Sequence, residues 1–205
     1  MKDNVYLISK GENFSRGKKP QETIYFLSSY LLFLIIAIFG AWIVGLIGVG
    51  LTFLIHKLYN KKTKEGFSKK VIFDTSCVYQ IDGPDKYDIN KLFGLYEGFD
   101  RKNSIRFGWR YLAGVIEIFS YCYTNGDVKF KKITECYPKE ELTMSMKINS
   151  DSYELEVLKN ISGEMIKMVV KKIKNKNTFD WLIFKGYPFF GGNTSAPHDM
   201  KINIF

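Results

Sequence analysis

The chain has 205 residues, a formal net charge of +9, 16% aromatic residues and three cysteines. Residues 1–70 hold eleven Lys or Arg against four acids, and the remaining 135 hold nineteen against seventeen, so the excess charge lies near the N-terminus. This distribution argues against nucleic acid as a partner, because a nucleic-acid-binding domain clusters Lys and Arg on its own surface. Three cysteines without CxxC spacing fit a reducing compartment better than a disulfide framework.

The first predicted element is a transmembrane helix over residues 23–56. Thirty-three consecutive residues from Thr23 to Ile55 carry no charge. A helix of that length is about 50 Å long, and a bilayer core is about 30 Å thick, so one tilted span fits. Residues 1–22 then form a basic N-terminal leader. The alternative is a re-entrant hairpin that turns near Gly40 and leaves both termini on one side.

Small residues recur along this predicted helix at a spacing of four. Such a stripe lets a second helix approach closely, which lipid alone does not promote. We therefore expect the stripe to contact another membrane subunit or a second copy of the chain, although Gly and Ala are also common in membrane helices for no such reason. The predicted helix-packing residues are Ala37, Ala41, Gly45, Gly48 and Thr52.

Residues 57–70 are interpreted as a basic juxtamembrane linker against the lipid surface. Its lysines outnumber the four basic residues just before the predicted span. The positive-inside rule therefore favours a cytoplasmic C-terminal domain. The predicted location is the inner (cytoplasmic) membrane, with a single pass. The predicted membrane-surface residues are Lys57, Lys61, Lys62, Lys64, Lys69 and Lys70.

From residue 71 onward the hydrophobic period is two, which is typical of strands with one buried face. Alternation is clear over 105–111, 142–148, 153–157 and 200–204, and the run 115–123 is apolar on both faces, as in an interior strand. Asn125-Gly126 predicts a tight hairpin turn. The predicted fold is mainly β, an antiparallel β-sandwich of jelly-roll type over residues 71–205, with one or two helical turns within Asp88–Tyr96.

Three segments resemble known proteins: residues 103–111, 121–126 and 187–199. They look like an uncharacterised family of small bacterial β-domain proteins whose chains close with an FGGN-x-x-APH segment, here residues 190–198. The predicted strand order is also similar to that of concanavalin-like and laminin-G-like sandwiches, which often bind glycans. The resemblance implies a fold and no particular activity.

Two arginines are candidate ligand or partner residues. Arg106 and Arg110 share one face of a predicted strand, where they could bind an acidic group, and Glu117 on the next strand is placed to pair with one of them. The alternative is a solvated face with cross-strand charge pairs. Tyr121 and Tyr123 share a face and could stack a sugar ring, although such rings are more often core residues.

Asn193 and His198 are the other candidate ligand or partner residues. They belong to a segment with two glycines and a proline, Gly191 to Asp199. The segment is either a ligand-binding loop or a structural corner in which both side chains bond the backbone.

No common catalytic signature occurs, since the chain lacks GxSxG, HExxH, a P-loop and Cys/His metal spacing. We therefore predict no enzyme, no catalytic residue, no cofactor and no metal. The predicted function is a bacterial membrane-anchored accessory or assembly subunit of a membrane complex, with the bilayer and other subunits or itself as partners. The alternative is a membrane-anchored ligand-binding module, for which a glycan is the expected ligand.

Overall fold

The structure is a computed structural model that describes residues 4–8, 47–54, 66–97, 102–162, 164–173 and 183–205. The chain divides into two compact units. The first comprises residues 1–17 together with 66–205, and the second comprises residues 18–65. Each unit is described by itself below.

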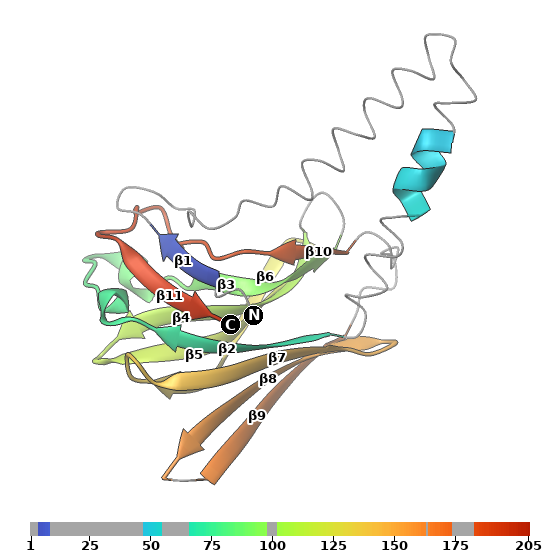
Figure 1. Cartoon of the computed structure of the whole chain (residues 1–205). Coiled ribbons are helices and arrows are strands. Elements are labelled where there is room, and N and C mark those ends of the chain that lie inside the picture. Colours follow the sequence, from blue (N-terminus) through green and yellow to red (C-terminus); the bar gives the residue numbers. More distant parts are fainter. Residues whose placement is uncertain (1–3, 9–46, 55–65, 98–101, 163, 174–182) are drawn as a thin grey trace. The chain divides into compact units, whose positions relative to one another are not determined.

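The first unit contains two antiparallel sheets (Figure 1). The six-stranded sheet has the order β1-β11-β2-β7-β8-β9. Its strands are β1 (Asn4–Ile8), β2 (Phe67–Phe73), β7 (Glu141–Ile148), β8 (Ser152–Ile161), β9 (Glu164–Ile173) and β11 (Met200–Ile204).

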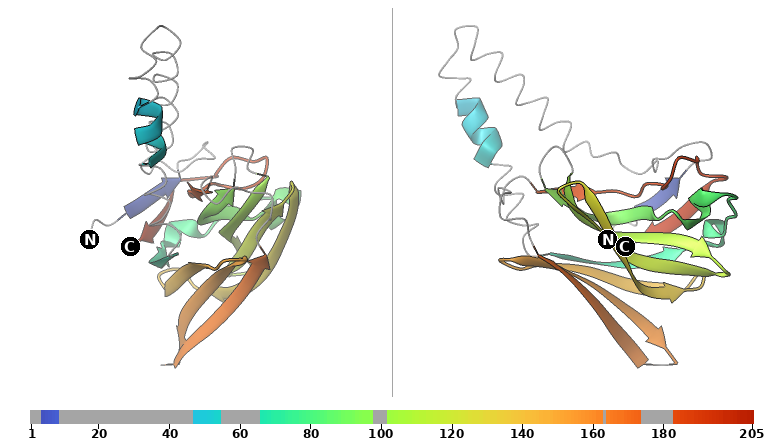
Figure 2. Two further views of the ribbon diagram at one scale, coloured as in Figure 1. Left: turned by 90° about the vertical axis from the view of Figure 1, so that its right-hand side faces the viewer. Right: turned by 180° about the vertical axis from the view of Figure 1, so that it is seen from behind.

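The five-stranded sheet has the order β10-β3-β4-β5-β6. Its strands are β3 (Asn90–Glu97), β4 (Asn103–Leu112), β5 (Val115–Thr124), β6 (Asp127–Cys136) and β10 (Ile183–Gly186). Two short 3-10 turns, η1 (Thr75–Cys77) and η2 (Pro84–Tyr87), lie between β2 and β3. The two views of Figure 2 show the sheets as two layers, so the predicted β-sandwich is confirmed.

The core lies between the layers and takes residues from both sheets. Trp109 is fully buried, with its ring centroid 5.2 Å from that of Phe73 and 5.9 Å from that of Tyr79. The indole Nε1 of Trp109 is buried without a hydrogen-bond partner among the described residues. Because aromatic burial is the largest single contribution a side chain makes to a core, this cluster anchors β4 against β2.

Tight turns fix the register of the strands that follow. Asn125 and Gly126 have φ values of 54° and 93° and join β5 to β6, which confirms the predicted hairpin. Ala113 and Gly114, with φ values of 51° and 89°, join β4 to β5 in the same way. β5 is interior and buried on both faces, also as predicted.

A bulge in β3 changes which of its side chains share a face. The register of β3 against β4 shifts between Lys91 and Gly94, and the intervening Leu92 and Phe93 both pack in the core. Lys91 and Gly94 therefore point the same way although they are three residues apart. The prediction of helical turns within Asp88–Tyr96 is wrong, because strand pairing on both sides holds this segment extended.

The sandwich is also larger than the predicted residues 71–205. β1 comes from the predicted leader and pairs with β11, and β2 begins at Phe67 within the predicted linker. Lys69 and Lys70 are consequently strand residues of the sandwich, and their contact with a lipid surface stays a prediction. Lys57, Lys61, Lys62 and Lys64 lie outside the described residues, as does the rest of the leader beyond Ile8.

The prediction of a transmembrane helix over residues 23–56 is contradicted. Of that predicted span the structure describes residues 47–54, which are helical, and residues 23–46 and 55–56 lie outside the described residues. Within the described part of the chain, no helix has both the length and the apolar character needed to cross a membrane. Thr52 donates a hydrogen bond from Oγ1 to the Gly48 carbonyl, 2.7 Å away on its own helix. Ala37, Ala41 and Gly45 lie outside the described residues.

Candidate functional site

The candidate site is the face of the five-stranded sheet that points away from the core, called the outer face here. Strand pairing places Arg106 opposite Tyr121 and Tyr121 opposite Phe130 in one row. A row here means residues that pair across neighbouring strands. Because alternate residues of a strand share a face, the rows two residues before and after this one lie on the same face and add further cations and rings. The outer face comprises Lys91, Arg106, Arg110, Glu117, Phe119, Tyr121, Tyr123, Phe130 and Lys132.

Aromatic rings form a continuous surface across β5 and β6. The Tyr121 and Phe130 rings are nearly parallel, 9° apart in plane with centroids 6.5 Å apart, and Phe119 meets Phe130 edge to face at 6.2 Å. Phe119 and Tyr121 are only 3% and 9% exposed, whereas Phe130 is 56% exposed. Phe130 therefore presents a ring to solvent on a base of buried rings, which is the geometry of a stacking platform.

Lys91 is a half-buried cation among these rings. Its Nζ lies 4.7 Å from the centroid of Tyr121 and 5.8 Å from that of Phe189. Within the described ranges, no carboxylate forms an ion pair with Lys91. Burial and the nearby charge of Arg106 lower the pKa of Lys91, and Asp88 offsets this only in part. Burial and the nearby Arg106 charge thus disfavour the charged form of Lys91, and an anion bound beside Lys91 would favour it.

Arg106 and Arg110 share the outer face, as their spacing predicts, but they have different partners. Arg106 is half-buried and donates a hydrogen bond from Nη2 to the Tyr187 carbonyl, in the segment after β10. Arg110 donates from Nε to Glu117 Oε2 at 2.6 Å, and Lys132 donates to Glu117 Oε1 at 2.8 Å. The predicted pairing of Glu117 with one arginine is therefore present at Arg110.

Both carboxylate oxygens of Glu117 accept a hydrogen bond from a cation, one from Arg110 and one from Lys132. Burial alone would raise the pKa of Glu117, but the hydrogen bonds from Lys132 and Arg110 outweigh burial and hold the pKa below its usual value. Arg110 also packs its guanidinium 4.9 Å from the Phe119 centroid and donates from Nη1 to the Tyr87 carbonyl. Arg110 is thus held in place by the protein itself.

Two tyrosine hydroxyls lie beside this arrangement. The Tyr121 and Tyr123 hydroxyl oxygens are 3.4 Å apart, and either can be the donor. Burial, together with the hydrogen bond to Tyr123, raises the pKa of Tyr121. Tyr121 is therefore protonated at neutral pH and able to donate a proton or a hydrogen bond.

The segment with Asn193 and His198 has the geometry of a corner. His198 Nε2 is 2.8 Å from the Ser76 carbonyl, the backbone bond expected of a corner residue. Asn193 uses its backbone N–H, which donates to Asp85 Oδ2 at 3.2 Å. Thr194 also bonds Asp85, and Gly192 has a φ of 79° that favours glycine.

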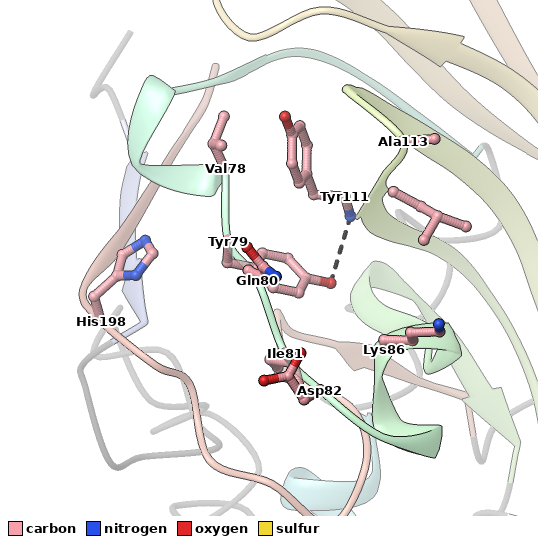
Figure 3. Close-up of a pocket in the computed structure, with 10 residues that line it drawn as sticks. Val78, Tyr79, Gln80, Ile81, Asp82, Lys86, Tyr111, Ala113 and His198 are labelled. Carbon is pink, nitrogen blue, oxygen red and sulfur yellow. Dashed lines mark hydrogen bonds between the residues drawn. The ribbon is translucent and has the colours of Figure 1, made fainter.

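His198 also lines a pocket of about 560 Å³ (Figure 3). The Tyr79 ring lies across its floor, where the Tyr79 hydroxyl accepts a hydrogen bond from the Tyr111 N–H at 3.4 Å. The remaining lining residues are Val78, Gln80, Ile81, Asp82, Lys86, Leu112 and Ala113. No group of three or more His, Cys, Asp or Glu in the described ranges could hold a metal ion.

Comparison with known proteins gives a fold likeness and no family. No family model matches the chain. No curated protein matches it in sequence. Among solved structures, the alginate lyase from Klebsiella pneumoniae aligns with a TM-score of 0.50 at 12% identity, covering 68% of this chain and 57% of the lyase. The alginate lyase from Alteromonas sp. 272 aligns with a TM-score of 0.39 at 10% identity, covering 68% of this chain and 67% of the lyase.

At such low identity the likeness to the Klebsiella protein shows the fold alone. It agrees with the broad expectation of a concanavalin-like sandwich and leaves the FGGN-x-x-APH family unidentified. It also overturns the prediction that the chain is not an enzyme, because that prediction treated a sandwich without familiar motifs as non-catalytic. The same architecture forms an enzyme in Klebsiella. The accessory-subunit role, the lipid and subunit partners and the inner-membrane location stay predictions.

Sequence reasoning missed Lys91 and Phe130 as outer-face residues. Lys91 fell in the segment expected to be helical, and its neighbours Leu92 and Phe93 hide the strand period because of the bulge. Phe130 could have been identified from the sequence, since it is the one aromatic residue in the otherwise Lys-rich strand β6. Its neighbours Lys129 and Lys131 point to the opposite face of the strand, so the ring itself is the signal.

Proposed function

We propose that the outer face of the five-stranded sheet binds an acidic saccharide. The observation that supports this best is Lys91, a half-buried ammonium between two rings that forms no ion pair with a carboxylate of the described residues and has Arg106 nearby. Placing two cations together is unfavourable in the free protein and becomes favourable when a carboxylate or sulfate binds between them. A saccharide is the fitting carrier of that acid group, because the exposed ring of Phe130 offers a stacking surface in the same row as Arg106 and Tyr121.

The fold likeness supports this proposal without deciding it. The Klebsiella neighbour is a lyase of alginate, an acidic polysaccharide, and it has the same sandwich architecture. The present chain spans 57% of that protein, so the neighbour's activity does not transfer with the fold. The glycan alternative from the sequence is retained here on Arg106 and Tyr121, which the sequence already indicated, together with Lys91 and Phe130.

The test is a binding measurement with matched lysine variants. Alginate oligosaccharides, oligogalacturonates and a neutral glucan oligosaccharide of the same length are titrated into the protein by calorimetry. We expect binding of an acidic oligosaccharide and none of the neutral one, with Lys91→Met weakening affinity about tenfold or more. Lys70→Met is the matched control, because it removes the same charge from the other sheet at a lysine that is 59% exposed.

Equal loss in Lys70→Met and Lys91→Met would mean that net charge alone attracts the saccharide, and the proposed face would be rejected. Equal affinity for acidic and neutral oligosaccharides would reject the acid-binding role of Lys91 and Arg106.

A second candidate function, β-elimination on a bound uronate, is favoured by the hydroxyl pair of Tyr121 and Tyr123. In this reaction the C5 proton leaves to a base, a C4–C5 double bond forms, and the C4–O bond breaks as the leaving oxygen takes a proton. The step balances with Tyr123 reacting as the phenolate: its oxygen takes the C5 proton, and Tyr121 gives its own proton to the leaving oxygen. A proton then returns from Tyr123 to Tyr121 across the 3.4 Å contact between the two oxygens.

Elimination is tested by the ultraviolet absorbance of the unsaturated product. We expect Tyr121→Phe and Tyr123→Phe to bind acidic oligosaccharides but to form no product. If wild-type protein binds without forming any unsaturated product, the outer face is a binding site only.

A further inference from the structure

Two glycines lie beside Arg106 on the outer face. In the strand register Gly186 of β10 pairs with Gly94 of β3, and Gly94 pairs with Arg106 of β4. The row therefore runs Gly186, Gly94, Arg106 and then Tyr121. The side chain of Arg106 extends along this row toward β10, because its Nη2 reaches the carbonyl of Tyr187, the residue after Gly186.

Side chains at either glycine would occupy the space that Arg106 fills. A Cβ atom on Gly186 would lie 2.9 Å from Arg106 Nε, 3.1 Å from Cζ and 3.4 Å from Nη2. A Cβ atom on Gly94 would lie 2.3 Å from the Ile105 carbonyl oxygen and 2.5 Å from the Arg106 Cα atom. Neither glycine has a φ in the left-handed region, so the requirement for glycine here is space and not backbone conformation.

We propose that Gly186 is a positioning residue that seats the Arg106 guanidinium against the Tyr187 carbonyl and thereby fixes where the acid group of a saccharide binds. The inference rests on the proposed function of the outer face. With Arg106 turned across Gly94 and Gly186, its charge lies over β3 and β10, on the same side as Lys91. The acid group then binds at the β10 side of the face, while the sugar rings extend over Tyr121 toward Phe130.

This placement makes Gly186 a determinant of specificity. A guanidinium at a fixed position donates two hydrogen bonds in a defined plane and so selects a planar acid group at one location. A guanidinium displaced by a side chain at position 186 keeps its charge but loses that geometry. The expected consequence is weaker discrimination between acidic and neutral saccharides with an unchanged net charge.

Gly186→Ala is the informative variant, because the added methyl group meets the far end of a flexible side chain. The corresponding change at Gly94 would meet backbone atoms and disturb β3 itself. We expect Gly186→Ala to unfold at nearly the wild-type temperature, to bind alginate oligosaccharides about tenfold more weakly and to leave any affinity for a neutral glucan unchanged. A Gly186→Ala protein that fails to fold would overturn the inference, since it would show that position 186 is limited by the fold.

A double-variant cycle with Arg106→Ala separates the inference from the proposed function. We expect Arg106→Ala to weaken alginate binding at least as much as Gly186→Ala, and Gly186→Ala to add nothing in the Arg106→Ala background. Arg106→Leu provides a second background, because leucine ends at Cδ and lacks the Nε, Cζ and Nη2 atoms that meet the new Cβ, so Gly186→Ala should again have no effect.

The outcomes differ for the two claims. Wild-type affinity in Arg106→Ala would reject the anion-binding site itself and the inference with it. Weak binding in Arg106→Ala combined with full binding in Gly186→Ala would overturn only the positioning role. A loss caused by Gly186→Ala that persists in both Arg106 backgrounds would also overturn it, because Gly186 would then act without Arg106.

Discussion

The outward faces of the two sheets use charge in different ways. On the six-stranded sheet, Glu156 Oε2 accepts from Lys167 at 2.6 Å and from Lys147 at 3.2 Å, and Lys70 pairs with Glu141 at 2.8 Å. These lysines are about half exposed, whereas the Glu156 side chain is 11% exposed. On the five-stranded sheet, Lys91 lies among aromatic rings beside another cation.

This difference separates a solvated surface from a candidate site. Cross-strand pairs with half-exposed lysines satisfy each other and contribute little energy, so these pairs leave no charge for a ligand to neutralise. A partly desolvated cation held against rings has given up hydration without gaining a counter-ion among the described residues. The energetic cost is recovered when an anion binds, which is why perturbed groups gather at functional sites.

The largest expected effect is on stability and comes from the charged pair within the outer face. Glu117→Gln leaves Arg110, whose side chain is 15% exposed, without its carboxylate partner. We expect the free energy of unfolding to fall by about 1–3 kcal/mol in urea denaturation. Glu156→Gln is the matched change on the other sheet, where the lysine partners are half exposed, and should cost less than about 1 kcal/mol.

The sign of the pH dependence follows from the lowered pKa of Glu117. Its contribution is present above the ordinary glutamate pKa and is lost as the pH falls through the depressed folded value. The stability difference between wild type and Glu117→Gln should therefore shrink in acid. Equal costs for Glu117→Gln and Glu156→Gln at neutral pH would contradict the contrast between the two faces.

A smaller effect is expected on the pH dependence of saccharide binding. Burial and Arg106 lower the pKa of Lys91 below its ordinary value of 10.5, so Lys91 loses its proton at a lower pH than an exposed lysine. Affinity for an acidic oligosaccharide should be constant below that lowered pKa and should fall about tenfold as the pH rises through it.

Lys91→Arg tests the origin of this pH dependence, because a guanidinium stays charged over the whole range. The variant should show a flat affinity profile measured by calorimetry. A fall of the same size in Lys91→Arg would assign the pH dependence to another group.

The smallest expected effect concerns apolar side chains exposed on each face. Phe130→Ala removes the exposed ring of the stacking platform and should weaken binding of an acidic oligosaccharide about threefold to tenfold. Val169→Ala is the control, since Val169 is 47% exposed on the six-stranded sheet. Binding that is unchanged by Phe130→Ala, or reduced equally by both changes, would remove Phe130 from the site.

Part of the site was accessible from the sequence. The alternation around Arg106 and Arg110 placed both arginines on one face, and Glu117 was identified as a partner on the next strand. What could not be predicted was which arginine Glu117 would bind. That choice depends on the β4–β5 register, which places Arg110 opposite Glu117 and Arg106 opposite Tyr121.

By itself, the sequence determined β4, β5, β7, β8 and β11 and the turn at Asn125-Gly126, because the period of two and the need for φ > 0 are local properties. Tertiary structure decided that β1 joins the sheet at β11, since pairing between residues near opposite ends of the chain leaves no local signal. Tertiary structure also decided that Lys91 faces outward beside Arg106. The bulge turns both Leu92 and Phe93 into the core, and packing against the second sheet is what stabilises that arrangement.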